Sequence, residues 1–446
     1  MKLTFLNSAS VVIEHNGIKI LCDPWLVDGE FYGAWAHYPP CNFTPEYFND
    51  VDFIYISHIH PDHFSTKTLE KMNKKIPILI HGYHFKYLKE NIHRLGFKPI
   101  ELSHNTRTHL KDDLYINILA ADNCDPQLCL KYFGCGLAEK TFGSTSIDSM
   151  CVIDNCKEVI VNTNDCPFPL GQTAATTIKN DYKKIDMLLA GYSSATAYPQ
   201  CFDLSKEQKE MEKQIIINKF FSQAEAYVNL LKPRFFMPFA GRYVLAGKNW
   251  KLNNQRAVPE LEEAYDYFIS SKNTDQSLSK CIILNSKSSF DITTGKASDS
   301  YERVNQEEKS RYIENVLAQV KYDFEYEKEP ETGELIPLIQ KCYERFENKR
   351  KELRFSSNTA IILDFNNDAL VVSANGNGYK LESKKSVENH KKYVQISVDK
   401  KLFKWLLLGP KFAHWNNAEI GSHLRYTRNP NIYERGLFYC LNFFHV

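Results

Sequence analysis

Short apolar segments alternate with polar, helix-compatible stretches from Lys2 to about Ser193, and this alternation restricts the fold more than any other feature of the sequence. Apolar segments this short, bounded by polar residues, are typical of buried strands. The predicted strands are Lys2–Leu6, Ser10–Glu14, Ile18–Cys22, Phe53–Ile56, Ile78–His81, Cys151–Ile153, Val159–Asn162 and Met187–Leu189. Strands that alternate with helices build stacked layers, so the sequence predicts an α/β fold.

A long helix is predicted between Ser205 and Leu231. Ser205 with Gln208 three residues later forms the pattern of a capping box, and the second half of the segment is apolar at helical spacing. Pro233 ends the helix because proline has no backbone N–H. Three further strands are predicted after it, at Arg234–Gly241, Cys281–Asn285 and Phe290–Thr293.

The C-terminal third of the chain predicts a separate small α+β domain. Residues 301–350 are strongly charged and contain few large apolar side chains, so we interpret them as a helical connector. The strands predicted beyond it are Thr359–Asp364, Leu370–Ser373, Tyr379–Leu381 and Val394–Val398, with an amphipathic helix from Lys401 to about Leu408. The expected division is therefore 1–300, 301–350 and 351–446.

The balance of charge argues against charged polymers as partners. The chain has 55 lysine and arginine residues against 54 aspartate and glutamate residues, so no overall basic field attracts nucleic acid or an anionic membrane. The first residues are too short an apolar run for a signal peptide, and no apolar stretch has the length of a membrane span. We expect a cytoplasmic protein whose 12 cysteines are mostly reduced thiols.

The most informative segment is the loop after the strand Phe53–Ile56, which contains His58, His60, Asp62 and His63. His58 and His60 are two residues apart on extended backbone, so both side chains project to one side and can bind one cation. Asp62 and His63 can turn toward a second cation. Imidazole and carboxylate suit zinc or iron, and ligands gather at the carboxyl ends of strands in layered α/β proteins.

The pattern His58-x-His60-x-Asp62-His63 after an apolar strand resembles the signature of the metallo-β-lactamase superfamily. This resemblance implies an αββα sandwich for the catalytic domain, residues 1–300. Other segments are similar in order and spacing to the branch that contains CMP-N-acetylneuraminate hydroxylases: Asn7-Ser8-Ala9, Ile20–Trp25, Asp148–Cys151, Val161–Cys166, Gly191–Ala195, Pro238–Tyr243 and Arg428–Tyr433.

The resemblance also implies the remaining metal ligands. Asp165 follows the strand Val159–Asn162, and its counterpart in the superfamily bridges two metals. Where a histidine usually completes the first site, this chain has the segment Ala121–Pro126, so we assign Asp125 to that position and keep Asp122 as its substitute. An oxygen ligand there shifts the preference toward iron or manganese. The expected cofactors are two divalent metal ions, iron or zinc, with manganese as a third choice.

Three functions remain open at this stage. The first is a hydrolase in which Asp62 and Asp165 act at a water activated by the two metals, with a small polar substrate such as a nucleotide sugar or an N-acyl compound. The second is a non-haem diiron oxygenase of the hydroxylase branch. That branch carries a Rieske cluster, but no Cys-x-His motif occurs here, so we expect a separate electron-transfer protein in that case. The third is a metal-binding module without catalysis. We favour the hydrolase.

Residues at other strand ends are candidates for binding the substrate. Tyr192 and Ser193 follow one predicted strand and Arg242 and Tyr243 follow another, so their hydroxyls and guanidinium can hold an anionic or sugar-like molecule. Ordinary turn chemistry explains the same residues equally well. In the C-terminal domain, which resembles sterol-carrier domains, the segment His414–Asn417 and the terminal aromatics predict core packing or a homodimer contact rather than a ligand cavity.

Overall fold

Two large sheets form the centre of the computed structural model, which describes residues 1–121, 148–366, 368–383 and 390–446. The first sheet has the strand order β17-β16-β1-β2-β3-β5-β6-β7 and the second β15-β13-β12-β11-β10-β9-β8. The first comprises β1 (Lys2–Asn7), β2 (Ser10–His15), β3 (Ile18–Cys22), β5 (Phe53–Tyr55), β6 (Ile78–His81), β7 (Pro99–Leu102), β16 (Ser289–Asp291) and β17 (Lys296–Ala297). The second comprises β8 (Thr108–Lys111), β9 (Leu114–Ala120), β10 (Ser149–Asp154), β11 (Val159–Asn162), β12 (Met187–Gly191), β13 (Phe235–Phe239) and β15 (Lys280–Cys281).

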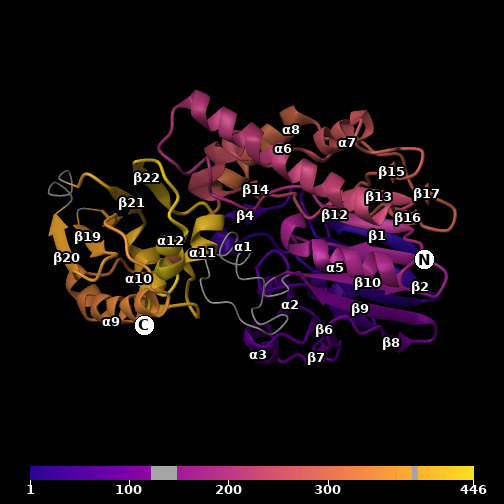
Figure 1. Ribbon diagram of the computed structural model, residues 1–446, viewed down its shortest axis with the longest axis horizontal. Helices are drawn as coiled ribbons and strands as arrows, with labels where there is room; N and C mark the ends of the chain where they lie inside the picture. The colour runs from indigo at the N-terminus through magenta and orange to yellow at the C-terminus, as the bar shows by residue number, and fades with distance from the viewer. Residues whose placement is uncertain (122–147, 367, 384–389) are drawn as a thin grey trace.

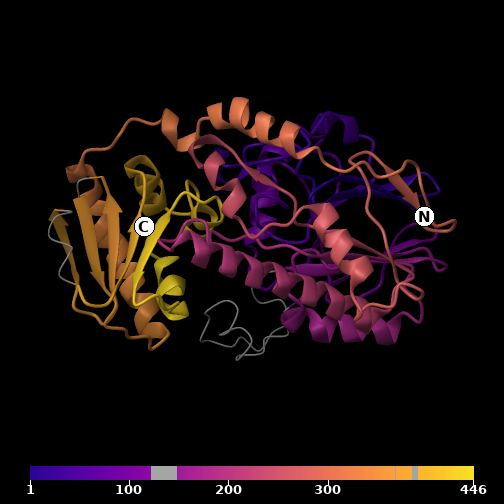
Figure 2. The ribbon, with the colours of Figure 1, turned by 90° about the horizontal axis from the view of Figure 1, so that it is seen from above.

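The two sheets face each other, and helices cover their outer faces (Figures 1 and 2). A core of buried side chains from both sheets, such as Val11, Ile20, Ile118 and Met187, fills the space between them. The helices α5 (Phe168–Asp181), α6 (Lys206–Leu231) and α7 (Leu261–Ser270) pack on the second sheet, and α2 (Thr66–Leu69) and α3 (Tyr87–Arg94) pack on the first. The predicted αββα sandwich is confirmed.

Strand β10 shows why the central strands are apolar without interruption. Cys151 and Ile153 belong to the core between the sheets, whereas Met150 and Val152 pack on the helical side. Side chains alternate between the two faces of a strand, and both faces of this strand are covered, so every position favours an apolar residue. Such runs are visible in the sequence, and the predicted strand Val159–Asn162 coincides with β11.

Helix α6 begins as its capping box predicts. The Ser205 hydroxyl accepts a hydrogen bond from the backbone N–H of Gln208, and the Gln208 side chain accepts one from the backbone N–H of Ser205. In contrast, the strand predicted at Cys281–Asn285 is limited to β15, because this edge strand pairs with β13 only at Lys280 and Cys281. Strands β7, β8 and β9 were not predicted.

The C-terminal part forms a five-stranded sheet of order β20-β19-β18-β21-β22, at the left of Figure 1. Its strands are β18 (Ala360–Phe365), β19 (Asp368–Ser373), β20 (Tyr379–Ser383), β21 (Tyr393–Ser397) and β22 (Arg425–Asn429), accompanied by α10 (Lys400–Leu408), α11 (Trp415–Ile420) and α12 (Arg435–Leu441). The connector contains α8 (Gln306–Asn315) and α9 (Thr332–Glu352), and buried residues of α9, such as Ile339 and Phe346, share a core with this sheet.

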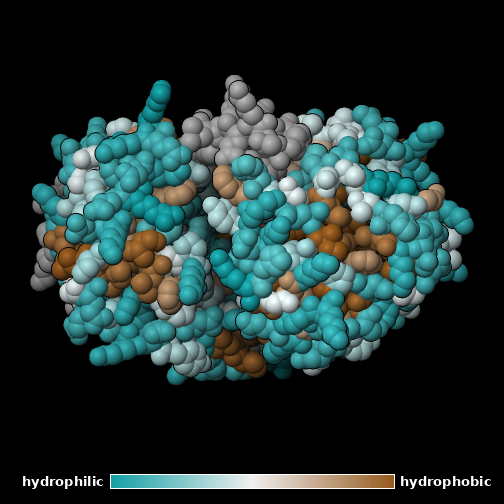
Figure 3. Space-filling model, turned by 90° about the horizontal axis from the view of Figure 1, so that it is seen from below, coloured by the Kyte–Doolittle hydropathy of each residue, from teal (hydrophilic) through white to brown (hydrophobic). Residues whose placement is uncertain are grey.

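The same core continues into the sandwich. Trp25, Phe31 and Trp35 of the N-terminal half belong to the buried cluster that contains the C-terminal strands. Phe31 lies in α1 (Glu30–Gly33) and Trp35 in β4 (Trp35–Ala36), which pairs with β14 (Val244–Leu245). Among the described residues, no helix is long and apolar enough to cross a membrane, and the face seen in Figure 3 is largely hydrophilic with separate apolar patches.

Glu30 in α1 is a buried carboxyl group close to the core that the sandwich shares with the C-terminal sheet. Its side chain is buried and accepts a 2.6 Å hydrogen bond from the Ser65 hydroxyl. Burial raises the pKa of Glu30 from 4.5 to about 8, although the Ser65 hydrogen bond and Lys67 oppose the change. The folded state therefore holds this proton more tightly than the unfolded state, and the stability that the protonated carboxyl contributes is lost as the pH rises through about 8.

The variant Glu30→Gln cannot titrate at this position. We expect its free energy of unfolding to exceed that of the wild-type protein by an amount that grows between pH 5 and pH 9, measured by denaturant unfolding at several pH values. The variant Glu46→Gln, at an exposed position, serves as the control. A difference between Glu30→Gln and wild type that does not change with pH would contradict the assignment.

Candidate metal centre

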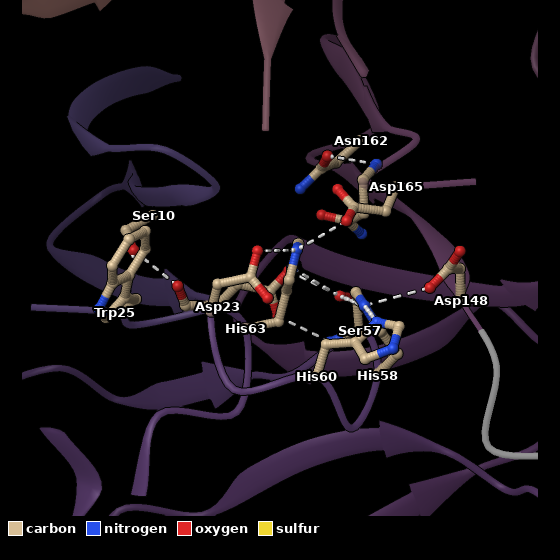
Figure 4. A network of polar contacts seen from close by, with 12 residues as sticks. Ser10, Asp23, Trp25, Ser57, His58, His60, His63, Asp148, Asn162 and Asp165 are labelled. Carbon is tan, nitrogen blue, oxygen red and sulfur yellow. Dashed lines mark hydrogen bonds and ion pairs between the residues drawn. The ribbon is translucent and has the colours of Figure 1, made fainter. Parts of the chain in front are cut away.

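The loop that contains the three histidines is held by the buried carboxylate of Asp23, directly after β3. Asp23 Oδ1 accepts a hydrogen bond from the backbone N–H of Ser57 at 2.7 Å, and Oδ2 accepts one from the Ser57 hydroxyl at 2.7 Å. Oδ2 also lies 2.9 Å from Nδ1 of His63. Figure 4 shows this network, in which the end of β3 fixes both ends of the histidine segment.

Four of the predicted ligands and one further aspartate converge in two overlapping groups that share His58. Nε2 of His58 lies 2.9 Å from Nδ1 of His60 and 3.2 Å from Oδ1 of Asp148. Nε2 of His63 lies 3.3 Å from Oδ2 of Asp165 and 3.6 Å from Oδ2 of Asp62. The groups that can hold an ion are thus His58, His60 and Asp148, and His58, His63 and Asp165, with Asp62 beside the second.

These separations suit ligands around a cation. Metal–nitrogen and metal–oxygen bonds of about 2.1 Å at tetrahedral angles place neighbouring ligand atoms about 3.4 Å apart. The distances from Nε2 of His58 to His60 and Asp148, and from Nε2 of His63 to Asp165 and Asp62, are 2.9 to 3.6 Å and bracket this value, and all ligand atoms of each group lie within 4.8 Å of one another. The histidines are neutral nitrogen ligands and the aspartates are hard oxygen ligands, so the donor set fits zinc, iron or manganese.

The charges of the side chains also favour a cation. Burial, together with Asp165, raises the pKa of Asp148 to about 7. Burial raises the pKa of Asp62 to about 7 as well, with Asp165 adding to the increase and His63 opposing it. The pKa of His58 is lowered by burial and by His63 and His60, which keeps this imidazole neutral and able to bind a metal. When a cation binds, the carboxyl protons leave, and the positive charge of the ion offsets the repulsion among the carboxylates.

His63 behaves in the opposite way. Burial alone lowers the pKa of this imidazole, but the carboxylates of Asp165, Asp62 and Asp23 together raise the pKa well above its usual value. Without a cation, a proton on His63 therefore balances part of the negative charge. A metal ion at Nε2 replaces that proton, while Nδ1 keeps its contact with Asp23.

Asp165 reaches the site from the end of β11. Asn164, with a left-handed φ of 47°, turns the chain, and its backbone N–H donates to the side-chain oxygen of Asn162. Gly191 at the end of β12 permits this turn, because a Cβ atom there would lie 2.5 Å from the carbonyl oxygen of Asn164. This turn brings Oδ2 of Asp165 to 3.3 Å from Nε2 of His63.

Asp148 was not predicted as a ligand. The assignments to Asp125 and Asp122 fall outside the described residues, and within the described ones Asp148 completes the group with His58 and His60. The sequence contains a signal for it, since Asp148 immediately precedes the buried strand β10. Strand β10 is antiparallel to β11, so the start of one strand lies beside the end of the other.

The predicted substrate residues have different surroundings. Tyr192 is buried against the helical layer, where burial raises the pKa of its hydroxyl and the Arg242 guanidinium opposes that change. Tyr243 stacks on Trp35 with ring centroids 3.4 Å apart, and burial raises its pKa, with the Asp62 carboxylate adding to the increase. Ser193 lies against Gly241. The Arg256 guanidinium opposes this increase in the Tyr243 pKa.

Residues 2–131 match a family described as the beta-lactamase superfamily domain. The matched region includes the histidine loop and strands β1 to β9, and the later strands and the outer helices complete the sandwich. The αββα sandwich of this chain thus includes a region similar to that superfamily domain.

Similar proteins include two curated relatives and one solved structure. A putative Rieske 2Fe-2S iron–sulfur protein of Mycolicibacterium smegmatis is 28% identical over 217 residues, 47% of this chain and 38% of that protein. Cytidine monophosphate-N-acetylneuraminic acid hydroxylase of Xenopus laevis is 25% identical over 259 residues, 55% of this chain and 38% of the relative. Isothiocyanate hydrolase from Delia radicum gut bacteria has a TM-score of 0.43 and 14% identity, over 65% of this chain and 99% of that structure. The match therefore spans about two fifths of these curated relatives.

The role of Asp148 can be tested by removing its charge. We expect Asp148→Asn to weaken binding of Zn²⁺ or Mn²⁺ at the first group by at least about 10-fold, because a carboxylate ligand is replaced by a neutral amide. Competition with a chelating dye measures the affinity. Asp181→Asn, at an exposed position at the end of α5, is the matched control. Equal affinities of Asp148→Asn and wild type would exclude Asp148 as a ligand.

Proposed function

We propose that the chain is a metal-dependent hydrolase that uses two divalent cations to cleave a small polar substrate. The observation that carries this proposal is the convergence of three imidazoles and three carboxylates, from the ends of β5 and β11 and the start of β10, at one edge of the sandwich. When bound, divalent cations lower the pKa of a water molecule and polarise a substrate oxygen.

The side chains of the site have three proposed roles: binding a cation, acting on the water, and positioning the histidines. His58, His60 and Asp148 would hold one cation, and His63 and Asp165, with Asp62 beside them and His58 shared, would hold the other. Asp62 and Asp165 are the proposed catalytic residues, because their carboxylates flank His63 and can orient the attacking water and accept its proton. Asp23 and Ser57 keep the histidines in position.

A side-chain nucleophile is not needed for this reaction. Cys166 lies directly beside Asp165, but burial together with the nearby carboxylates of Asp148 and Asp165 raises the pKa of its thiol well above the usual value. A thiol in this state is a poor nucleophile at neutral pH. The Ser57 hydroxyl is occupied by Asp23 and His58. Activated water is therefore the nucleophile that the site supports best.

The substrate class rests on the residues around the centre. We propose a nucleotide-sugar or N-acyl substrate, held beside Tyr243, because the Asp62 carboxylate contributes to the raised pKa of this tyrosine. Ser193 and Arg242 would bind anionic or hydroxyl groups of the same substrate, whereas Tyr192 is buried in the helical layer and is not part of this proposal. Small molecules, rather than nucleic acid or membranes, are the proposed partners, because positive and negative residues balance. A cytoplasmic location and homodimer formation belong to the same proposal.

A second candidate is a non-haem diiron oxygenase. It is favoured by the curated relatives whose names contain hydroxylase and by the carboxylate Asp148 in the first group. Such a reaction requires electrons, which we assign to a separate electron-transfer protein, whereas hydrolysis requires only water and the groups of the site. A metal-binding module without catalysis is the third candidate, and the three aspartates beside the histidines argue against it.

Metal content and activity separate these candidates. We expect protein prepared without metal to gain activity toward ester, phosphodiester or amide substrates when Zn²⁺ or Mn²⁺ is added. Asp165→Asn should lower that activity at least about 100-fold while its thermal unfolding stays close to wild type, since Asp165 is partly exposed. Asp181→Asn should retain it. Activity that appears only with iron, oxygen and a reductant would favour the oxygenase, and protein that binds metal without either activity would favour the binding module.

A further inference from the structure

The C-terminal part reaches the metal centre through Asn416 in α11. Its side-chain oxygen Oδ1 lies 3.3 Å from Nε2 of His60. The other nitrogen of this imidazole, Nδ1, lies 2.9 Å from Nε2 of His58 and therefore faces the first group of ligand atoms. One ring thus points its inner nitrogen at the centre and its outer nitrogen at a residue 356 positions later in the chain.

In all three histidines one ring nitrogen faces the ligand group and the other contacts a hydrogen-bonding partner. The outer nitrogen of His63 contacts Oδ2 of Asp23 at 2.9 Å, and that of His58 contacts the Ser57 hydroxyl at 2.9 Å. Histidines that bind metals hold the proton on the outer nitrogen and donate it to an acceptor, which fixes the tautomer and the ring orientation. Asp23 and Ser57 belong to the sandwich, whereas the acceptor for His60 comes from the C-terminal part.

The backbone around Asn416 is fixed by contacts with the N-terminal half. The backbone N–H of His414 donates to the hydroxyl of Tyr32 at 2.8 Å, and the indole N–H of Trp35 donates to the carbonyl oxygen of Ile420 at 3.3 Å. Nε2 of His423 lies 2.8 Å from the carbonyl oxygen of Phe31. These three contacts hold both ends of α11 against α1 and β4, so the Asn416 side chain has a defined position.

The start of α11 adds to this rigidity. Nδ1 of His414 accepts a hydrogen bond from the backbone N–H of Asn416 and so caps the helix. Burial, with His445 and His60 nearby, lowers the pKa of His414 to about 4, so this ring stays neutral at pH 7 and can accept the bond. A capping acceptor satisfies a backbone N–H that the helix leaves unpaired.

We propose that Asn416 is a positioning residue for the metal ligand His60, so that the C-terminal part completes the metal centre. This inference rests on the metal site of the proposed function, but not on hydrolysis. The Asn416 carboxamide oxygen accepts the N–H proton of His60 Nε2, which leaves the Nδ1 lone pair directed toward the cation. Without that acceptor, the ring is free to rotate or to change tautomer, and the first group loses affinity.

The test compares metal affinities of the full chain. We expect Asn416→Ala to bind Zn²⁺ at the first group about 10- to 100-fold more weakly than wild type, measured by competition with a chelating dye. Asn416→Asp keeps an acceptor oxygen and should recover most of the affinity. Asn377→Ala, at an exposed turn between β19 and β20, should match wild type. Thermal unfolding of the metal-free variants checks that each one folds.

A second measurement separates orientation of the ring from general damage. In Co²⁺-loaded wild-type protein, the exchangeable imidazole N–H protons of the ligand histidines give shifted proton NMR signals in water. We expect Asn416→Ala to lose one of these signals through faster exchange, and Asn416→Asp to retain it. Unchanged affinity and signals in Asn416→Ala would overturn the inference and leave the proposed hydrolase standing. Absence of hydrolysis with an intact difference in affinity would overturn the hydrolase alone, and wild-type protein that binds neither Zn²⁺ nor Co²⁺ would overturn both.

Discussion

The hydrogen bonds of the Asp23 carboxylate are the interaction on which the site depends. This fully buried side chain accepts from the backbone and hydroxyl of Ser57 and contacts His63, so one carboxylate holds both the beginning and the end of the histidine loop. The carbonyl oxygen of Asp23 in turn accepts from the Ser10 hydroxyl. Because β3 pairs with β5 in the first sheet, the sandwich itself positions the loop.

The loop held by Asp23 lies where several carboxylates come close together at the site. Asp62, Asp148 and Asp165 lie around His58 and His63 in a mostly buried site, where each carboxylate disfavours the charge of the others. Isolated carboxylates are costly to bury, and a divalent cation removes that cost by binding them directly. The arrangement fits a metal centre, because crowded buried carboxylates without a cation would lower the stability of the fold.

The sequence predicts the layers and the central motif well, because both are local. The apolar runs of β3, β6 and β11 coincide with observed strands, and the spacing of His58 and His60 places them together. Edge strand β8 escaped prediction because its side chains are alternately half-buried and exposed, which leaves a weak apolar pattern. The partners Asp148 and Asn416 escaped for another reason, since only tertiary structure brings them to the histidines.

The central claim is that two groups of side chains bind two cations at the carboxyl edge of the sandwich, and anomalous diffraction from crystals of the metal-loaded protein tests it most directly. The account predicts one anomalous peak within bonding distance of Nε2 of His58 and Nδ1 of His60, and a second beside Nε2 of His63. Crystals that contain the metal but show no peak at either position, or peaks bound by other residues, would contradict it.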